Sequence, residues 1–104
     1  MSKQIIIHTL SMCEHCYNLK KALAAENLEF MEVDCMEPHN YQRADELEAL
    51  YQTDKYPMVI LYSHNPEIGS LIIVDDSSPA TGEEVLKYSN PTQLLTLIKE
   101  NLED

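Results

Sequence analysis

A strand-like run that leads into two closely spaced cysteines and then into a helix-like segment limits the fold of this chain more than any other feature. Residues 4–9 are mostly apolar and β-branched, which predicts a buried strand that ends near Leu10. Cys13 and Cys16 follow, and from residue 14 to about residue 27 the apolar side chains recur at helical spacing. The segment therefore predicts a strand, a short loop and a helix, with the cysteine pair at the junction.

The rest of the chain alternates between strand patterns and helix patterns. Alternating or continuous apolar positions predict three more strands, at residues 30–35, 58–62 and 71–74, the last two forming a hairpin. Helical spacing predicts a helix over residues 44–52 and a terminal helix that begins at Asn90-Pro91. Asn is a preferred N-cap, and Pro suits the first helical position. Residues 83–88 fit either a short strand or a single turn.

The order of these elements is β-α-β-α-β-β-α, which defines an α/β fold class. Right-handed crossovers place the first two strands in parallel, and the hairpin adds antiparallel strands. We expect a mixed four-stranded sheet with helices on both faces. Because 104 residues are about the size of one domain, residues 1–104 are expected to form a single domain.

Charge and hydropathy exclude several classes of function. A formal net charge of −11 leaves too few Lys and Arg for a phosphate-binding surface, so no nucleic-acid partner is expected. The apolar runs are far shorter than the roughly 20 residues that cross a bilayer, so no membrane association is expected. The first residues enter a strand without the apolar stretch of a secretory signal, which predicts a cytoplasmic protein. Nothing in the sequence demands a dimer, and we expect a monomer.

Cys13 and Cys16 could form a redox pair, supply half of a metal site, or be two buried thiols. A structural disulfide framework is not expected, because the chain holds three cysteines and the cytosol keeps thiols reduced. Structural zinc needs four ligands, often from two Cys-x-x-Cys pairs, and the sequence has no second pair. No metal site is predicted, although a metal or iron–sulfur carrier stays an alternative if two chains share the ion.

The position of the pair at the start of a helix favours thiol–disulfide exchange and gives the two cysteines different roles. The unpaired N–H groups and partial positive charge of the helix N-terminus stabilise a thiolate at Cys13, the form that attacks a disulfide. Cys16, one turn deeper, is then the resolving thiol. His15 favours the Cys13 thiolate and Glu14 opposes it, so both are candidate tuning residues. Tyr17, directly after the pair, is a candidate to cover it.

Cys13-Glu14-His15-Cys16 between the first strand and the first helix, together with Tyr56-Pro57 before the third strand, resembles the glutaredoxins, a family with the thioredoxin-like fold. The similarity covers nearly the whole chain. It implies a thiol–disulfide oxidoreductase in which Cys13 and Cys16 are catalytic and disulfides of proteins or small molecules are the substrates. It also implies a cis peptide bond at Pro57, beside the pair. We assign Tyr17, Tyr56 and Pro57 to a substrate- or glutathione-binding set, with the Tyr56 backbone available to a bound peptide.

Three places depart from the pattern that holds glutathione in this family. Leu10 replaces the usual Lys before the first cysteine, and Lys55-Tyr56-Pro57 replaces Thr-Val-Pro. The Gly-Gly-x-Asp stretch is replaced by Ser89-Asn90-Pro91-Thr92, in which Pro91 has no backbone N–H for a glutathione carboxylate. We expect either glutathione or a thioredoxin reductase to supply electrons, and we expect no tightly bound cofactor.

A different class of function is a redox-inactive module that keeps the fold and engages a partner through its acidic surface. The missing glutathione residues and the long loop at residues 75–82 favour this alternative. Cys35 and His8 are interpreted as packed side chains without a chemical role.

Overall fold

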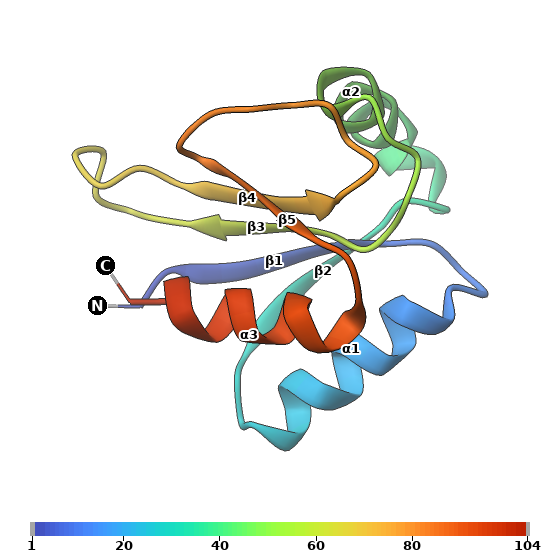
Figure 1. The fold of residues 1–104 in the computed structure, drawn as a ribbon. Helices are drawn as coiled ribbons and strands as arrows, with labels where there is room; N and C mark the ends of the chain where they lie inside the picture. The colour runs from blue at the N-terminus through green and yellow to red at the C-terminus, as the bar shows by residue number, and fades with distance from the viewer. Residues whose placement is uncertain (1, 104) are drawn as a thin grey trace.

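A central β-sheet carries helices on both of its faces (Figure 1). The computed structural model describes residues 2–103. The strands are β1 (Gln4–Thr9), β2 (Phe30–Asp34), β3 (Met58–Tyr62), β4 (Leu71–Asp75) and β5 (Val85–Tyr88). The helices are α1 (Glu14–Ala25), α2 (Tyr41–Tyr51) and α3 (Pro91–Asn101), with a short 3-10 helix, η1 (Pro38–Asn40), before α2.

The sheet is mixed, and its strand order is β2-β1-β3-β4-β5. β1 and β2 are parallel, as their connection through α1 requires. β3 runs antiparallel to both β1 and β4, and β4 pairs with β5 in parallel. The arrangement confirms the expected thioredoxin-like fold and the expected hairpin of β3 and β4.

The sheet has five strands, not the four expected from the sequence. The additional strand is β5, within the segment for which the pattern left a strand and a turn open. Val85 and Leu86 pair with Ile72 and Ile73 of β4, so the chain returns along the sheet before β5 begins. A strand of 4 residues carries little periodicity of its own, and its pairing partner lies elsewhere in the chain. Sequence pattern alone therefore could not identify it.

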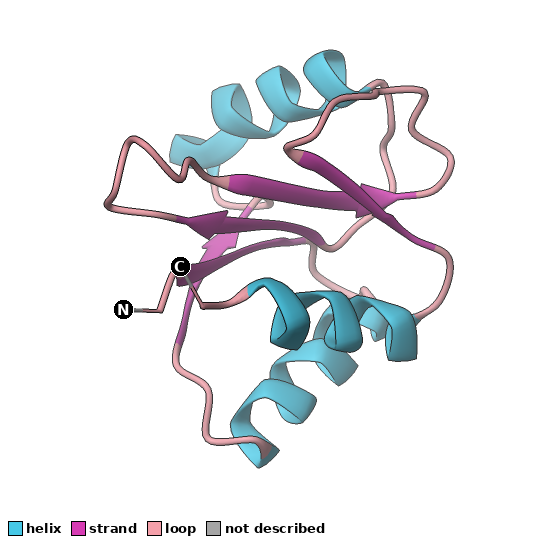
Figure 2. Cartoon of the chain, turned by 60° about the vertical axis from the view of Figure 1, so that its left-hand side comes forward, coloured by secondary structure: helices cyan, strands magenta, loops and turns pink. Residues whose placement is uncertain are grey.

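The helices are divided between the two faces of the sheet, and each face has its own apolar core. α1 and α3 lie together on one face and α2 lies on the other (Figures 1 and 2). Alternation along β3 separates the two cores, because Val59 and Leu61 pack on the α1–α3 side and Met58 packs on the α2 side. Leu19 of α1 belongs to the first core, whereas Cys16 belongs to the second. The first turn of α1 therefore lies where the two cores meet.

The three α-helices that the structure describes within residues 2–103 are short. The longest, α1, has 12 residues, whereas a membrane-spanning helix needs about 20. Across residues 2–103, no helix has the length and apolar character to cross a membrane.

Candidate active site at the start of helix α1

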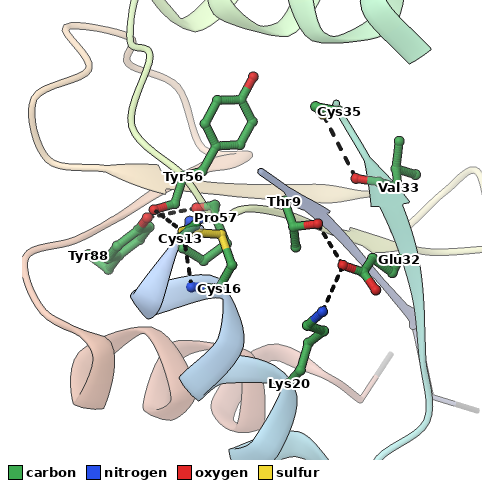
Figure 3. The surroundings of a disulfide bond; sticks show 10 residues. All are labelled: Thr9, Cys13, Cys16, Lys20, Glu32, Val33, Cys35, Tyr56, Pro57 and Tyr88. Carbon is green, nitrogen blue, oxygen red and sulfur yellow. Dashed lines mark hydrogen bonds and ion pairs between the residues drawn. A yellow bond between two sulfur atoms is a disulfide. The ribbon is translucent and has the colours of Figure 1, made fainter. Parts of the chain in front are cut away.

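Cys13 and Cys16 are joined by a disulfide bond at the N-terminus of α1 (Figure 3). Cys13 is the N-cap residue, with extended backbone angles, and its Sγ accepts a hydrogen bond from the Cys16 N–H at 3.1 Å. A sulfur atom thus takes the place that a hydroxyl or carboxylate oxygen has in most helix caps. In the reduced protein, the same N–H and the helix dipole favour negative charge on this sulfur.

The two cysteines differ in their access to solvent. Cys13 is partly exposed, whereas only 2% of Cys16 is exposed, because Cys16 packs into the α2-side core. A disulfide in solution can therefore reach Cys13 and cannot reach Cys16 directly. The roles of Cys13 as the attacking thiol and of Cys16 as the resolving thiol stay predictions, and this difference in exposure supports them.

In the loop before Cys13, the apolar side chain of Met12 extends into solvent. Met12 has a left-handed backbone with φ 59°, which is uncommon for a residue other than Gly, Asn or Asp, and its side chain is fully exposed at 103%. The left-handed angle turns the chain from the end of β1 into α1. Met12 is a site-adjacent residue that the sequence reasoning did not single out, because a methionine carries no turn signal.

The peptide bond between Tyr56 and Pro57 is cis, as the family resemblance implies. Pro57 immediately precedes β3 and lies beside the disulfide (Figure 3). The Sγ of Cys13 is 3.9 Å from the carbonyl oxygen of Tyr56. Elements distant in sequence thus meet here, since the N-terminus of α1 faces the chain that enters β3.

The Tyr56 side chain points away from the disulfide toward α2 (Figure 3). It is buried, and its hydroxyl donates a hydrogen bond of 2.6 Å to Oε2 of Glu48. Burial, followed by this hydrogen bond to a carboxylate, raises the pKa of Tyr56 far above its usual value, so the phenol stays a neutral donor. Only the backbone of Tyr56 therefore lies at the site. Its side chain anchors residues 56–58, which we call the Pro57 segment, to α2.

Two further side chains hold the Pro57 segment. The Tyr88 hydroxyl, on β5, donates a hydrogen bond of 2.7 Å to the carbonyl oxygen of Pro57 (Figure 3). Burial raises the pKa of Tyr88 well above its usual value, and the charges of Asp75 and Asp76 add to the effect. Nδ1 of His8, on β1, lies 3.1 Å from the carbonyl oxygen of Met58, so the ring nitrogen is the donor. Three elements thus fix the backbone beside the disulfide.

A model of the glutaredoxin family matches residues 5–62 of the chain. The chain belongs to the glutaredoxin family. The match runs from β1 through β3 and so includes both cysteines of the pair and Pro57. A search of curated proteins finds no significant match. Family membership and the Cys13–Cys16 pair together suggest a thiol–disulfide redox function.

Helix α1 of this glutaredoxin-family chain is tied to the sheet behind the disulfide. Oε2 of Glu32, on β2, accepts a hydrogen bond from the Thr9 hydroxyl at 2.6 Å and lies 3.0 Å from Nζ of Lys20 (Figure 3). The hydrogen bond from Thr9, more than the contact with Lys20, lowers the pKa of Glu32. Glu32 therefore stays charged and connects α1 to the middle of β2 and to Thr9 at the end of β1.

The remaining residues expected at the site lie on the exposed surface of α1. Glu14 and His15 occupy its first turn and are both exposed. Tyr17 is 59% exposed, and the Lys21 ammonium lies 5.3 Å from the centre of its ring. Tyr17 and Met12 together line an open hollow of about 520 Å³ beside Cys13. In the hollow, Met12 and Tyr17 provide apolar contact surface near the partly exposed Cys13. The tuning roles of Glu14 and His15 stay predictions.

The N-terminus of α3 lies at the position of the family's Gly-Gly-x-Asp stretch. Side chains of this segment hydrogen-bond to its own backbone N–H groups. Oδ1 of Asn90 accepts a hydrogen bond from the Gln93 N–H at 2.9 Å, which confirms Asn90 as the N-cap. Oε1 of Gln93 in turn accepts from the N–H and the hydroxyl of Ser89, each at 2.7 Å. An anion at a helix N-terminus is held by the backbone N–H groups of the first turn. In α3 most of these groups do not serve this purpose, because Pro91 has no N–H and the Gln93 N–H is bonded to Asn90.

Two other sequence interpretations concern buried residues. Cys35, the free cysteine, is 3% exposed, and burial raises the pKa of its thiol, so it stays protonated at neutral pH. Nε2 of His8 is buried and has no hydrogen-bond partner among the described residues. In residues 2–103, no group of three or more His, Cys, Asp and Glu side chains is placed to hold a metal ion.

Proposed function

We propose that the protein is a thiol–disulfide oxidoreductase of the glutaredoxin type, which transfers two electrons between its Cys13–Cys16 pair and external disulfides. The observation that carries the proposal is the position of Cys13. Cys13 is partly exposed, its sulfur caps α1 and lies beside the Tyr56–Pro57 backbone, and Cys16 is buried. This arrangement supports a thiolate that attacks from Cys13 and a second thiol held one turn away to complete the exchange.

The reaction is two consecutive exchange steps. The Cys13 thiolate attacks one sulfur of the substrate disulfide, a mixed disulfide forms, and the other substrate sulfur leaves as a thiolate that takes a proton. Cys16 then loses its proton and attacks the Cys13 sulfur, which forms the Cys13–Cys16 disulfide and releases the second substrate thiol. One disulfide is reduced to two thiols, and the protein dithiol is oxidised by two electrons. An external thiol or dithiol reverses both steps on the protein.

The source of electrons is either glutathione or a thioredoxin reductase. Tyr56 keeps a backbone that is able to pair with a bound peptide beside Pro57, which suits glutathione and a protein substrate equally. The closed N-terminus of α3 and Leu10 remove side-chain and backbone contacts that hold glutathione in the family, which favours a reductase. No tightly bound cofactor is required, and we propose a cytoplasmic monomer that has no nucleic-acid or membrane partner.

His15 and Glu14 adjust the balance between the reduced and oxidised pair. A protonated His15 stabilises the Cys13 thiolate, which makes the protein a stronger oxidant, and Glu14 acts in the opposite direction. Tyr17 provides an apolar cover beside the sulfur. Replacing each residue separately and measuring the reduction potential assigns the sign of each effect.

One comparison tests the proposal. The purified protein is offered 2-hydroxyethyl disulfide and NADPH, with electrons supplied through either glutathione and glutathione reductase or thioredoxin reductase. Turnover in one system identifies the donor, and absence of turnover in both contradicts the oxidoreductase function. Cys13→Ser is expected to abolish turnover, whereas Cys16→Ser should accumulate a mixed disulfide at Cys13. Full activity in Cys13→Ser would show that the roles are assigned wrongly.

A further inference from the structure

A small apolar pocket lies between α1 and α3, directly beside Pro57. Its volume is about 210 Å³. We call it the α1–α3 pocket, and the apolar residues that line it are Leu19, Ala22, Pro57, Tyr88, Pro91, Leu94 and Leu95. Three exposed polar residues, His15, Asn18 and Thr92, also line it. A pocket for a complete small molecule usually measures about 300 to 1,000 Å³, so this one suits a single side chain better.

The pocket is within reach of a chain attached to Cys13. Pro57 belongs to both places, because it lies beside the disulfide and also lines the pocket. His15 stands between the two cysteines in sequence and lines the pocket as well. A polypeptide joined to the Cys13 sulfur and passing along the Tyr56 backbone therefore presents a neighbouring side chain to this opening.

The chemistry of the pocket and its surroundings disfavours an anion. Most of the lining is apolar, and the N-terminus of α3, which contributes Pro91 and Thr92 to it, is capped by Asn90 and lacks the N–H of residue 91. The carboxylates of Asp75 and Asp76 act on the Tyr88 hydroxyl at the wall, and the chain carries a net charge of −11. A neutral apolar side chain flanked by basic residues complements this combination, whereas a ligand with carboxylates does not.

We propose that the α1–α3 pocket is a specificity pocket for a polypeptide disulfide, filled by one apolar side chain next to the cysteine that Cys13 attacks, with basic residues on either side. The inference rests on the proposed oxidoreductase function and names its substrate class. The pocket acts in recognition only, since the exchange converts the protein dithiol and the peptide disulfide into the protein disulfide and two peptide thiols.

The test compares disulfide-linked dimers of the peptides Arg-Cys-Leu-Arg, Arg-Cys-Ser-Arg and Arg-Cys-Asp-Arg. Freshly reduced protein is mixed with each dimer, quenched with acid, and the released peptide thiol is separated by chromatography. The Leu peptide is expected to react at least about tenfold faster than the Ser peptide and faster still than the Asp peptide. Equal rates for the three peptides would overturn the proposal.

Two matched variants assign the preference to the pocket. Ala22→Met fills the pocket and is expected to lower the rate with the Leu peptide about tenfold, and to lower the rate with 2-hydroxyethyl disulfide much less. Ala24→Met places the same side chain on an exposed position of the same helix and should change neither rate. Equal effects of the two variants on the Leu peptide would also overturn the proposal. Circular dichroism checks that both variants keep the native fold.

A structural readout separates this inference from the proposed function. In the Cys16→Ser protein, the Leu peptide is attached to Cys13 chemically from an activated mixed disulfide, so no turnover is needed. Nuclear Overhauser effects from the peptide Leu methyl groups to Ala22 and Leu95 are expected. If these nuclear Overhauser effects are present but the protein does not reduce 2-hydroxyethyl disulfide, the pocket proposal is supported and the proposed oxidoreductase function is contradicted. If they are absent while that disulfide is reduced, the pocket proposal fails alone.

Discussion

The hydroxyl of Tyr88 donates a hydrogen bond to the carbonyl oxygen of Pro57 at 2.7 Å, and both groups are buried. This bond joins β5, at one edge of the sheet, to the backbone beside the cysteine pair. Tyr56 forms the corresponding connection on the other face of the sheet through Glu48 of α2. The backbone beside the cysteine pair is therefore held from both faces of the sheet, which limits its motion.

Tyr88→Phe removes the donor and leaves the buried Pro57 carbonyl without it. We expect the free energy of unfolding to fall by about 1 to 3 kcal/mol, the usual cost of an unsatisfied buried acceptor. Urea denaturation of the reduced protein measures the change. Tyr41→Phe, which removes an exposed hydroxyl, is the matched control and should have little effect. A loss of stability in Tyr41→Phe as large as in Tyr88→Phe would contradict this assignment.

Tyr56 and Glu48 are expected to be energetically coupled. A partly buried hydrogen bond of 2.6 Å from a phenol to a carboxylate contributes about 1.5 to 3 kcal/mol. A double-mutant cycle with Tyr56→Phe and Glu48→Gln should give a coupling energy of at least about 1 kcal/mol in urea denaturation. Asp45→Asn replaces an exposed acid of the same helix, and its effect should simply add to that of Tyr56→Phe. If the effects of Tyr56→Phe and Glu48→Gln on stability are additive, the predicted coupling is contradicted.

The sequence predicted the parts of the site that depend on local pattern. The strand before Cys13, the helix after it and the Asn90 cap follow from residue types and spacing over a few positions. The cis bond before Pro57 followed from the family resemblance, because most X-Pro bonds in folded proteins are trans.

The contacts that hold the site could not be predicted in this way. Tyr88 reaches Pro57 only because β5 pairs in parallel with β4, and the strand pattern of β5 was too short to establish that pairing. Glu48 lies on α2 and Tyr56 in the loop before β3, so their contact depends on the path of the chain between these elements, although the two residues are only 8 positions apart. Such contacts depend on tertiary packing, and a single sequence carries no periodic signal for them.

The three thiols of the reduced protein should react with iodoacetamide in a fixed order. Cys13 is partly exposed and has a helix N-terminus to stabilise its thiolate, so it should be alkylated first. Burial raises the pKa of Cys35, so its alkylation should be at least about tenfold slower in the native protein than in urea. Mass spectrometry of peptides after timed quenching gives the order. Rapid labelling of Cys35 in the native protein would be incompatible with the buried position.

His8 is expected to make stability depend on pH near neutrality. Burial lowers the pKa of His8 below its ordinary value of 6.5, and its hydrogen bond to Met58 opposes this only in part. Between the folded and unfolded pKa values the unfolded chain binds the additional proton. The stabilising contribution is therefore complete above pH 6.5 and is lost as the pH falls toward the folded pKa.

Urea denaturation of the oxidised protein at intervals from about pH 7.5 to about pH 5.5 measures this dependence; the slope should approach at most about 1.4 kcal/mol per pH unit. His8→Phe removes the titrating group and is expected to flatten the slope whatever its effect on stability at pH 7.5. His39→Gln, which replaces a histidine at an exposed position of η1, is the matched control. An unchanged slope in His8→Phe would assign the pH dependence to other groups. The test compares slopes, so a change in the absolute stability of the variant does not affect it.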